Sequence, residues 1–113
     1  MENKQTLSDK EQIALRLKQA RNQAGLSQDQ AAALMKIPRP AISEIESAKR
    51  KVTLQEAIQF ADIYRVDKSW LLLEDEDQDT VQEAQKKLAA RELSKLDPEE
   101  FQKVMDLLKM IRK

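Results

Sequence analysis

A single glycine, Gly25, interrupts a chain of 113 residues that is otherwise rich in helix-forming residues. Ala, Leu, Gln, Glu and Lys favour helices, whereas tight hairpins and bulged sheets draw on glycine at their turns. Glycine also adopts, at the lowest cost, the left-handed conformation that commonly follows the end of a helix. The sequence therefore predicts an all-α protein in which a first helix, over residues 8–24, ends at Gly25.

Capping signals place two of the helices that follow. Ser27 with Gln30, and Thr53 with Glu56, have the Ser/Thr-x-x-Glu/Gln form of a capping box, in which each residue bonds a backbone amide of the other. We expect a short helix after Ser27 and a longer one from Thr53 to about residue 64. The apolar side chains expected on the buried face of the longer helix are Leu54, Ala57, Ile58 and Ala61.

Two prolines place a helix between these two. Proline is tolerated only in the first turn of a helix, so Pro38 and Pro40 predict a helix that runs from Pro40 to Ser47. Asp67 can cap a fifth, short helix that carries Trp70. A lone aromatic residue at the close of a helical domain is typical of a core, so we expect Trp70 to be buried rather than to stack on a base.

An acidic run divides the chain into a head and a tail. Residues 74–79 are expected to form a solvated linker between a head at residues 8–73 and a tail at residues 80–113. The tail should hold one helix over residues 80–93 and a second from Pro98 to Ile111, capped by Asp97.

The second tail helix has one apolar face, formed by Phe101, Val104, Met105, Leu108 and Ile111. This face adds more apolar surface than the small head needs to complete its core. An unburied apolar stripe of this kind marks a partner surface. Pairing with a second copy of the chain is the favoured interpretation. Folding back onto the same chain and binding of another protein are the alternatives.

Composition excludes most catalytic and metal chemistry. The chain has no Cys and no His, so disulfides, thiolate sites, the commonest acid/base group and most zinc sites are ruled out. We therefore expect no enzyme activity, no cofactor and no metal. The first residues lack the apolar core of an export signal, and no apolar run reaches the roughly 18 residues of a membrane span. The expectation is a cytoplasmic protein without a membrane partner.

Charge is distributed unevenly although the formal net charge is zero. Residues 16–51 contain eight Lys or Arg and three acids, whereas residues from 74 onward contain eleven acids and eight bases. A basic first part and an acidic second part suit a DNA-binding head followed by a tail that does not bind DNA.

Two short helices joined by a tight turn, within five helices in about 60 residues, form the architecture that presents one helix to the DNA major groove. Residues 13–73, just over half of the chain, also resemble the Xre/Cro-type helix-turn-helix domain of phage repressors and bacterial regulators. The features that carry the resemblance are Arg21 four residues before Gly25, Gly-Leu-Ser-Gln at 25–28, Ile42-x-x-Ile45-Glu46, the basic cluster at 49–51 and Trp70-Leu71-Leu72. It implies a five-helix lambda-repressor-like head followed by a C-terminal helical tail.

The resemblance makes the helix from Pro40 to Ser47 the recognition helix, with Ile42 and Ile45 turned into the core. The expected base contacts are Arg39, Pro40, Ser43 and Glu44. Arginine can read guanine through two bonds, serine can bond either base edge, and glutamate can accept from cytosine N4. Pro40 has no amide to donate, so it either contacts a thymine methyl or only starts the helix.

Phosphate contacts are expected from the start of the second helix and from basic side chains around the recognition helix. These residues are Ser27, Gln28, Lys36, Lys49, Arg50 and Lys51. Lys36 and Ala48 stand where the family often has glycine, so the backbone at Lys36 should be strained or the turn altered. The resemblance further implies that Arg21 and Glu46 form a structural ion pair between the first and third helices.

These features together predict a sequence-specific double-stranded DNA-binding regulator, a dimeric repressor that acts at its own or a neighbouring promoter. The alternative is an antitoxin or adaptor whose tail binds a partner protein. Residues 38–52 also resemble heads found in regulators encoded beside zinc metallopeptidases and in some antitoxins, which implies a peptidase or a toxin as that partner.

Overall fold

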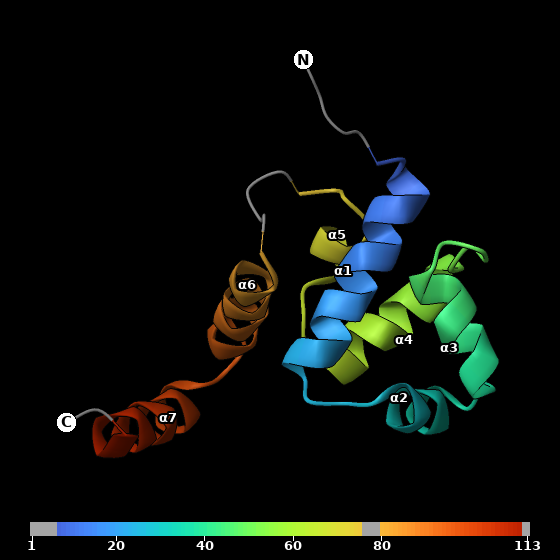
Figure 1. The fold of residues 1–113 in the computed structure, drawn as a ribbon. Helices are drawn as coiled ribbons and strands as arrows, with labels where there is room; N and C mark the ends of the chain where they lie inside the picture. Colours follow the sequence, from blue (N-terminus) through green and yellow to red (C-terminus); the bar gives the residue numbers. More distant parts are fainter. Residues whose placement is uncertain (1–6, 76–79, 112–113) are drawn as a thin grey trace.

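The computed structural model describes residues 7–75 and 80–111, and within these ranges it is helical with no strand (Figure 1). The prediction of an all-α protein is confirmed. The elements in chain order are α1 (Asp9–Gln23), α2 (Gln28–Met35), α3 (Arg39–Glu46), α4 (Leu54–Tyr64), α5 (Lys68–Leu71), α6 (Val81–Ser94) and α7 (Pro98–Ile111).

Local caps set where the helices begin and end. Complete capping boxes open α2 at Ser27 and α4 at Thr53, as predicted, and further boxes open α1 and α6. Asp97 and Glu100 bond each other's backbone amides at the start of α7, at 3.0 and 2.8 Å. After α1, Gly25 takes the left-handed conformation with φ +75°. The local signals at Ser27, Thr53, Asp97 and Gly25 therefore predicted the helix ends beside them.

Helices α1 to α5 enclose one core. Its largest fully buried side chains include Trp70, Tyr64, Phe60, Leu17 and Ile42. Trp70 lies inside, as predicted, and the Arg16 guanidinium stands over its ring at 5.0 Å from the centroid. Arg16 Nη1 also donates to the Trp70 carbonyl, which ties α1 to α5.

The predicted buried face of α4 was wrong in part. Ala57 and Ala61 are buried, but Leu54 and Ile58 are exposed, and Phe60 and Tyr64 occupy the core instead. The two rings stack with centroids 5.4 Å apart. Because aromatic rings bury more apolar area than Leu or Ile, α4 is rotated so that its aromatic stripe faces inward.

Helix α6 packs on the head against α1. Its first turns contribute Val81 and Ala84 to the same core. The Asp67 amide donates to the Ala84 carbonyl at 3.3 Å, and the Arg91 Nη1 of α6 donates to the buried Asp67 carboxylate. Asp67 does stand at the N-cap of α5, but its carboxylate makes no cap bond there, because Arg91 and Ser69 Oγ bond it.

The predicted linker lies partly within the described residues. Asp75 is half-buried and pairs with Lys87 of α6 at 2.7 Å, so this end of the run is not simply solvated. Residues 76–79 lie outside the described ranges. The division into a head and a tail stays a prediction, and the packing of α6 on α1 adds that the two are in contact.

Helix α7 differs from the other helices in that none of its side chains is buried. It follows α6 after a short turn and extends away from the head (Figure 1). Within the described ranges, no helix combines the length and the apolar character that crossing a membrane requires.

Candidate nucleic-acid interface

A turn of three residues, 36–38, joins α2 to α3 and sets their relative direction. Lys36 ends α2 in the left-handed conformation, with φ 61° and ψ 40°. The Ile37 amide then donates to the Ala32 carbonyl at 3.1 Å, which closes the turn. The family's usual glycine is thus replaced by a lysine in the same unusual backbone conformation. The exposed Lys36 side chain is left at the edge of the surface that α2 and α3 form.

Helix α3 divides cleanly into an inner and an outer face. Ile42 and Ile45 are 1% and 2% exposed, as the resemblance implied. The four residues expected to contact bases, Arg39, Pro40, Ser43 and Glu44, are all exposed. Pro38 stands at the N-cap with an extended backbone and Pro40 lies in the first turn, which explains where α3 begins. The outer face of α3 is therefore free to approach a partner.

Ser47 also lies on the outer face of α3, although it is not among the predicted base contacts. It follows Ser43 by four residues at the end of α3, so it shares the outer face, and it is exposed. Its hydroxyl donates to the Glu44 carbonyl at 3.3 Å. The four-residue spacing from Ser43 was a signal that could have identified it.

Arg39 has an acidic neighbour that the sequence analysis also missed. Asp29, in the first turn of α2, lies 3.6 Å from the Arg39 guanidinium, and the two side chains are 79% and 61% exposed. An exposed ion pair contributes about 0–1 kcal/mol, so it opens easily. The ion pair thus holds the Arg39 side chain near α2, and the guanidinium can still exchange Asp29 for a stronger acceptor.

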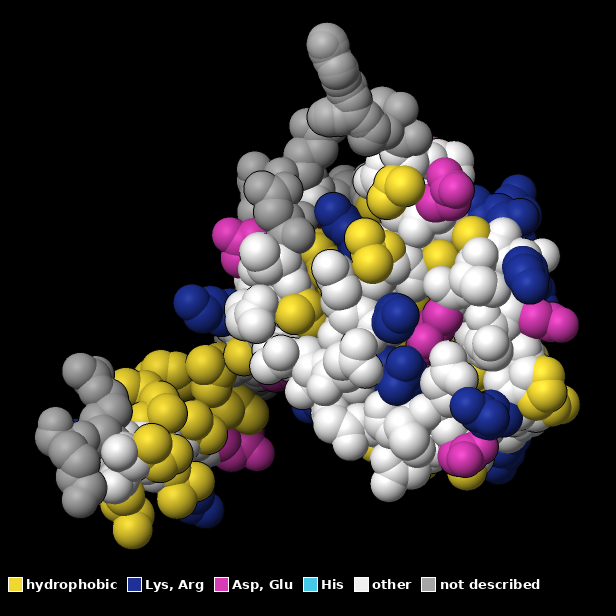
Figure 2. Space-filling view, in the orientation of Figure 1, with side chains coloured by type: hydrophobic (Ala, Val, Ile, Leu, Met, Phe, Trp, Pro, Cys, Tyr) yellow, Lys and Arg dark blue, Asp and Glu magenta, His cyan; other side chains and the backbone are white. Residues whose placement is uncertain are grey.

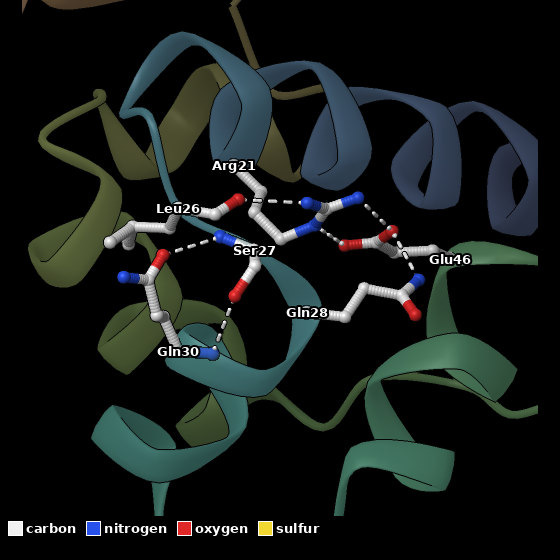
Figure 3. Close-up of polar contacts among 6 residues, drawn as sticks. All are labelled: Arg21, Leu26, Ser27, Gln28, Gln30 and Glu46. Carbon is white, nitrogen blue, oxygen red and sulfur yellow. Dashed lines mark hydrogen bonds and ion pairs between the residues drawn. The ribbon is translucent and has the colours of Figure 1, made fainter.

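The carboxylate of Glu46 holds α3 against α1 and α2 (Figure 3). Arg21 donates to it from Nε at 2.7 Å and from Nη2 at 3.1 Å, and Gln28 Nε2 donates at 3.1 Å. Arg21 Nη1 also donates to the Leu26 carbonyl at 2.8 Å. The structure therefore brings together the two residues that the sequence analysis paired, and it adds Gln28 to them.

This network is shielded from water. The Glu46 side chain is only 5% exposed, and the hydrogen bond from Arg21 is the main cause of a raised pKa of the arginine. Hydrogen bonds to charged groups are stronger than those between neutral groups, and two parallel bonds also fix the relative orientation of the partners. The network thus fixes the orientation of α3 relative to α1 and α2.

The basic loop after α3 contains two exposed cations and one that is already paired. Lys49 and Lys51 are exposed, whereas Arg50 donates to Glu56 of α4 at 2.7 and 3.3 Å. The guanidinium of Arg50 is thus bound within the chain, and the phosphate contact expected of it stays a prediction. The loop turns at Ala48, which has φ 64°, and this turn brings Arg50 back toward α4.

Ser27 and Gln28, at the start of α2, are also bonded within the chain, and their expected phosphate contacts stay predictions. The Ser27 amide donates to Gln30 and its hydroxyl accepts from the Gln30 amide, so both polar groups of Ser27 serve the capping box. Gln28 is half-buried and directs its amide nitrogen at Glu46. The start of α2 thus serves first to hold the turn and α3 in place.

The exposed charges gather along the α3 side of the head. Figure 2 shows Lys and Arg side chains spread over this side, with Asp and Glu side chains between them. The exposed cations that flank α3 in the structure are Lys36, Lys49 and Lys51. Among residues 7–75 and 80–111, no cluster of three or more acidic, His or Cys side chains is arranged to hold a metal ion.

Comparison with known proteins agrees with this geometry. Residues 17–71 match the family model described as Helix-turn-helix, a span that runs from α1 to α5. Among curated proteins, none matches the chain. The tight turn between α2 and α3, the exposed outer face of α3 and this family match indicate a DNA-binding transcription regulator of the helix-turn-helix class. Residues 17–71 therefore form a helix-turn-helix domain of the Xre/Cro-like type.

Proposed function

We propose that the protein is a sequence-specific repressor that occupies a promoter, its own or a neighbouring one, as a homodimer in the cytoplasm. The observation that carries the proposal is the outer face of α3, where Arg39, Ser43 and Glu44 are exposed while Ile42 and Ile45 are buried. A helix of this kind fits the major groove, where arginine, serine and glutamate can each bond base edges.

The cations beside α3 support a phosphate-binding role. Lys36 lies before the helix, and Lys49 and Lys51 follow it, so positive charge lies at both ends of the proposed base-reading surface. Contacts of this kind position a protein on the duplex without reading its sequence. Gln28 is proposed to reach a phosphate from the start of α2 while it stays bonded to Glu46. Arg50 and Ser27 are assigned structural roles.

The small size of the head supports the proposed dimerisation. One recognition helix covers about one half-site, and pairs of heads on paired half-sites are the usual solution in this class. An antitoxin or adaptor would use the exposed face of α7 for a peptidase or a toxin instead. That alternative predicts a purified chain that stays monomeric and binds DNA weakly.

Selection of bound sites from random duplex DNA tests the proposed function. The expected result is an enriched motif with two related half-sites, bound at least about a thousandfold more tightly than random duplex at the same salt concentration. Enrichment of no motif, together with equal affinity for all duplexes at low salt, would overturn the proposal.

A further inference from the structure

Helix α6 completes the core of the head, although it lies outside the helix-turn-helix domain at residues 17–71. Val81 and Ala84, among the first four residues of α6, belong to the same buried cluster as Leu17 and Trp70. The Ala84 side chain is 0% exposed. Detachment of α6 would therefore expose apolar groups of the head to water, which costs free energy.

A buried acid gives the head a second dependence on α6. Asp67 stands before α5, and its side chain is 1% exposed. The Arg91 guanidinium of α6 donates to this carboxylate, and the Asp67 amide donates to the Ala84 carbonyl at 3.3 Å. Removing one partner of a buried ion pair destabilises a fold far more than breaking an exposed pair does. Arg91 thus supplies, from the tail, a charge that stabilises the head.

The contact between α6 and the head is nevertheless small. Of the 14 residues of α6, Val81 and Ala84 are buried, and both lie at its start. The other side chains of α6 are half-buried or exposed, and that of Arg91 is 47% exposed. We call the contacts of Val81, Ala84 and Arg91 with the head the α6 seat. A segment with few buried contacts opens locally at a lower free energy than the whole domain, so we expect α6 to detach and return while α1 to α5 stay folded.

The α6 seat adjoins the turn of α1 that holds the proposed recognition helix. Gln82, beside Val81, donates from Nε2 to Gln23 Oε1 at the end of α1, at 3.4 Å. The last turn of α1 also carries Arg21, whose guanidinium bonds Glu46 of α3. Figure 1 shows α1 between α6 and α3, and α1 contacts both of them. A change at the α6 seat can therefore reach α3 through α1.

We propose that the seating of α6 is coupled to DNA binding. With α6 seated, the last turn of α1 is held from both sides and keeps α3 in the orientation that binds the major groove. With α6 detached, this turn and α3 lose order, and the affinity for DNA falls. The proposal rests on the proposed function and deepens it by adding a conformational control of the α3 surface. Coupling between two sites is reciprocal, so bound DNA also holds α6 on the head.

Amide hydrogen exchange of the full-length wild-type chain tests this reciprocity without any substitution. Binding of a duplex obtained by selection should slow exchange of the α6 amides at residues 85–90 several-fold, because detachment of α6 becomes rarer. These amides lie across α1 from α3, so direct cover by the DNA does not account for the slowing. The amides of α7, which has no buried side chain, are the internal control and should exchange at an unchanged rate.

Arg91→Gln tests the coupling from the tail, because it removes the charge that bonds Asp67 and keeps a polar side chain in its place. We expect the affinity for the selected duplex to fall by about fivefold or more. Exchange at residues 20–24 and 40–46 should become faster even without DNA. Lys95→Gln is the matched control at the C-cap of the same helix, where Lys95 forms an exposed pair with Glu92 at 3.6 Å. It removes the same charge and should change the affinity by less than about twofold.

Two results would each overturn the coupling. One is exchange of the α6 amides that DNA leaves unchanged, or slows no more than it slows those of α7, which would indicate pairing of the tails instead. The other is an Arg91→Gln variant with the affinity of the wild type and unchanged exchange in α3. Circular dichroism verifies that the variants are folded. If Arg91→Gln is not, Val81→Ala takes its place as a milder change of the α6 seat.

Failure of the coupling is distinguishable from failure of the proposed function. A chain that binds no duplex would overturn the repressor function alone. Exchange of the α1 and α3 amides in Arg91→Gln without DNA then still decides whether α6 is coupled to α3.

Discussion

Arg21 and Glu46 are joined by two hydrogen bonds, at 2.7 and 3.1 Å, across 25 residues of sequence. One residue lies in the last turn of α1 and the other ends α3, so this pair links the scaffold of the head to its proposed recognition helix. Because Gln28 bonds the same carboxylate, the orientation of α3 depends on one buried acid.

Glu46→Ala is expected to lower the free energy of unfolding by roughly 3 kcal/mol, because it leaves the Arg21 charge buried without its partner. Urea unfolding followed by circular dichroism measures the change. Arg65→Ala is the control, because Arg65 forms an exposed pair with Asp62 at 3.9 Å and should change stability by less than about 0.5 kcal/mol. If Glu46→Ala lowers the free energy of unfolding no more than the control does, the Arg21–Glu46 pair does not stabilise the domain.

Arg39→Ala and Lys49→Ala should affect DNA binding in different ways. Loss of Arg39 removes a base contact, so affinity for the selected site should fall by about 1–3 kcal/mol while affinity for random duplex changes little. Loss of Lys49 removes a phosphate contact, so all duplexes should bind more weakly and the slope of log affinity against log salt should decrease by about one. Fluorescence anisotropy at several salt concentrations measures both. Equal losses on specific and random DNA for both variants would contradict the assignment.

Asp29→Asn should strengthen DNA binding. The substitution removes the negative charge that pairs with Arg39, so the guanidinium no longer has to give up Asp29 before it bonds DNA. It also removes a charge that would repel the DNA phosphates. We expect a gain of about two- to fivefold in affinity at low salt that diminishes as salt screens the charges. Asp62→Asn, on α4, serves as the comparison for a general change of charge. A gain of the same size from both variants would contradict a specific role for Asp29.

The Arg50–Glu56 pair predicts a loss of stability in acid. Burial acts to raise the pKa of Glu56, but hydrogen bonds from Arg50 and from the Thr53 cap outweigh it and leave the pKa lowered. The pair therefore stabilises the fold fully above the unfolded pKa of glutamate, about 4.3, and this contribution is lost as pH falls through the lower folded pKa. The stability difference between the wild type and Glu56→Gln should be constant near neutral pH and shrink below about pH 4. Glutamine keeps the capping box, so a difference that stays constant in acid would exclude the ion pair as its source.

Local signals predicted the elements of this fold because their causes lie within a few residues. The Ser27–Gln30 and Thr53–Glu56 boxes, the prolines before α3 and the turn at Gly25 all depend on the backbone beside them. The outer and inner faces of α3 were predictable too, since the two isoleucines of this short helix share one side.

The rotation of α4 could not be predicted in this way. Its sequence offers two overlapping apolar stripes, one through Leu54 and Ile58 and one through Phe60 and Tyr64, and both share Ala57 and Ala61. Which stripe is buried depends on the helices that pack against it. The same applies to Arg50, whose position in a basic run suggested a free cation until the loop at Ala48 brought it to Glu56.

The sequence by itself determined where the helices start and stop, which side of α3 is apolar and where positive charge gathers, because each of these follows from neighbouring residues. Only the tertiary structure decided which charged groups are already bound and which stay exposed. Arg50 and Arg91 pair with acids on other segments, whereas Lys49 and Lys51 are exposed at the surface. The pairing of a charge is set by distances across the fold, and residue spacing along the chain does not encode these distances.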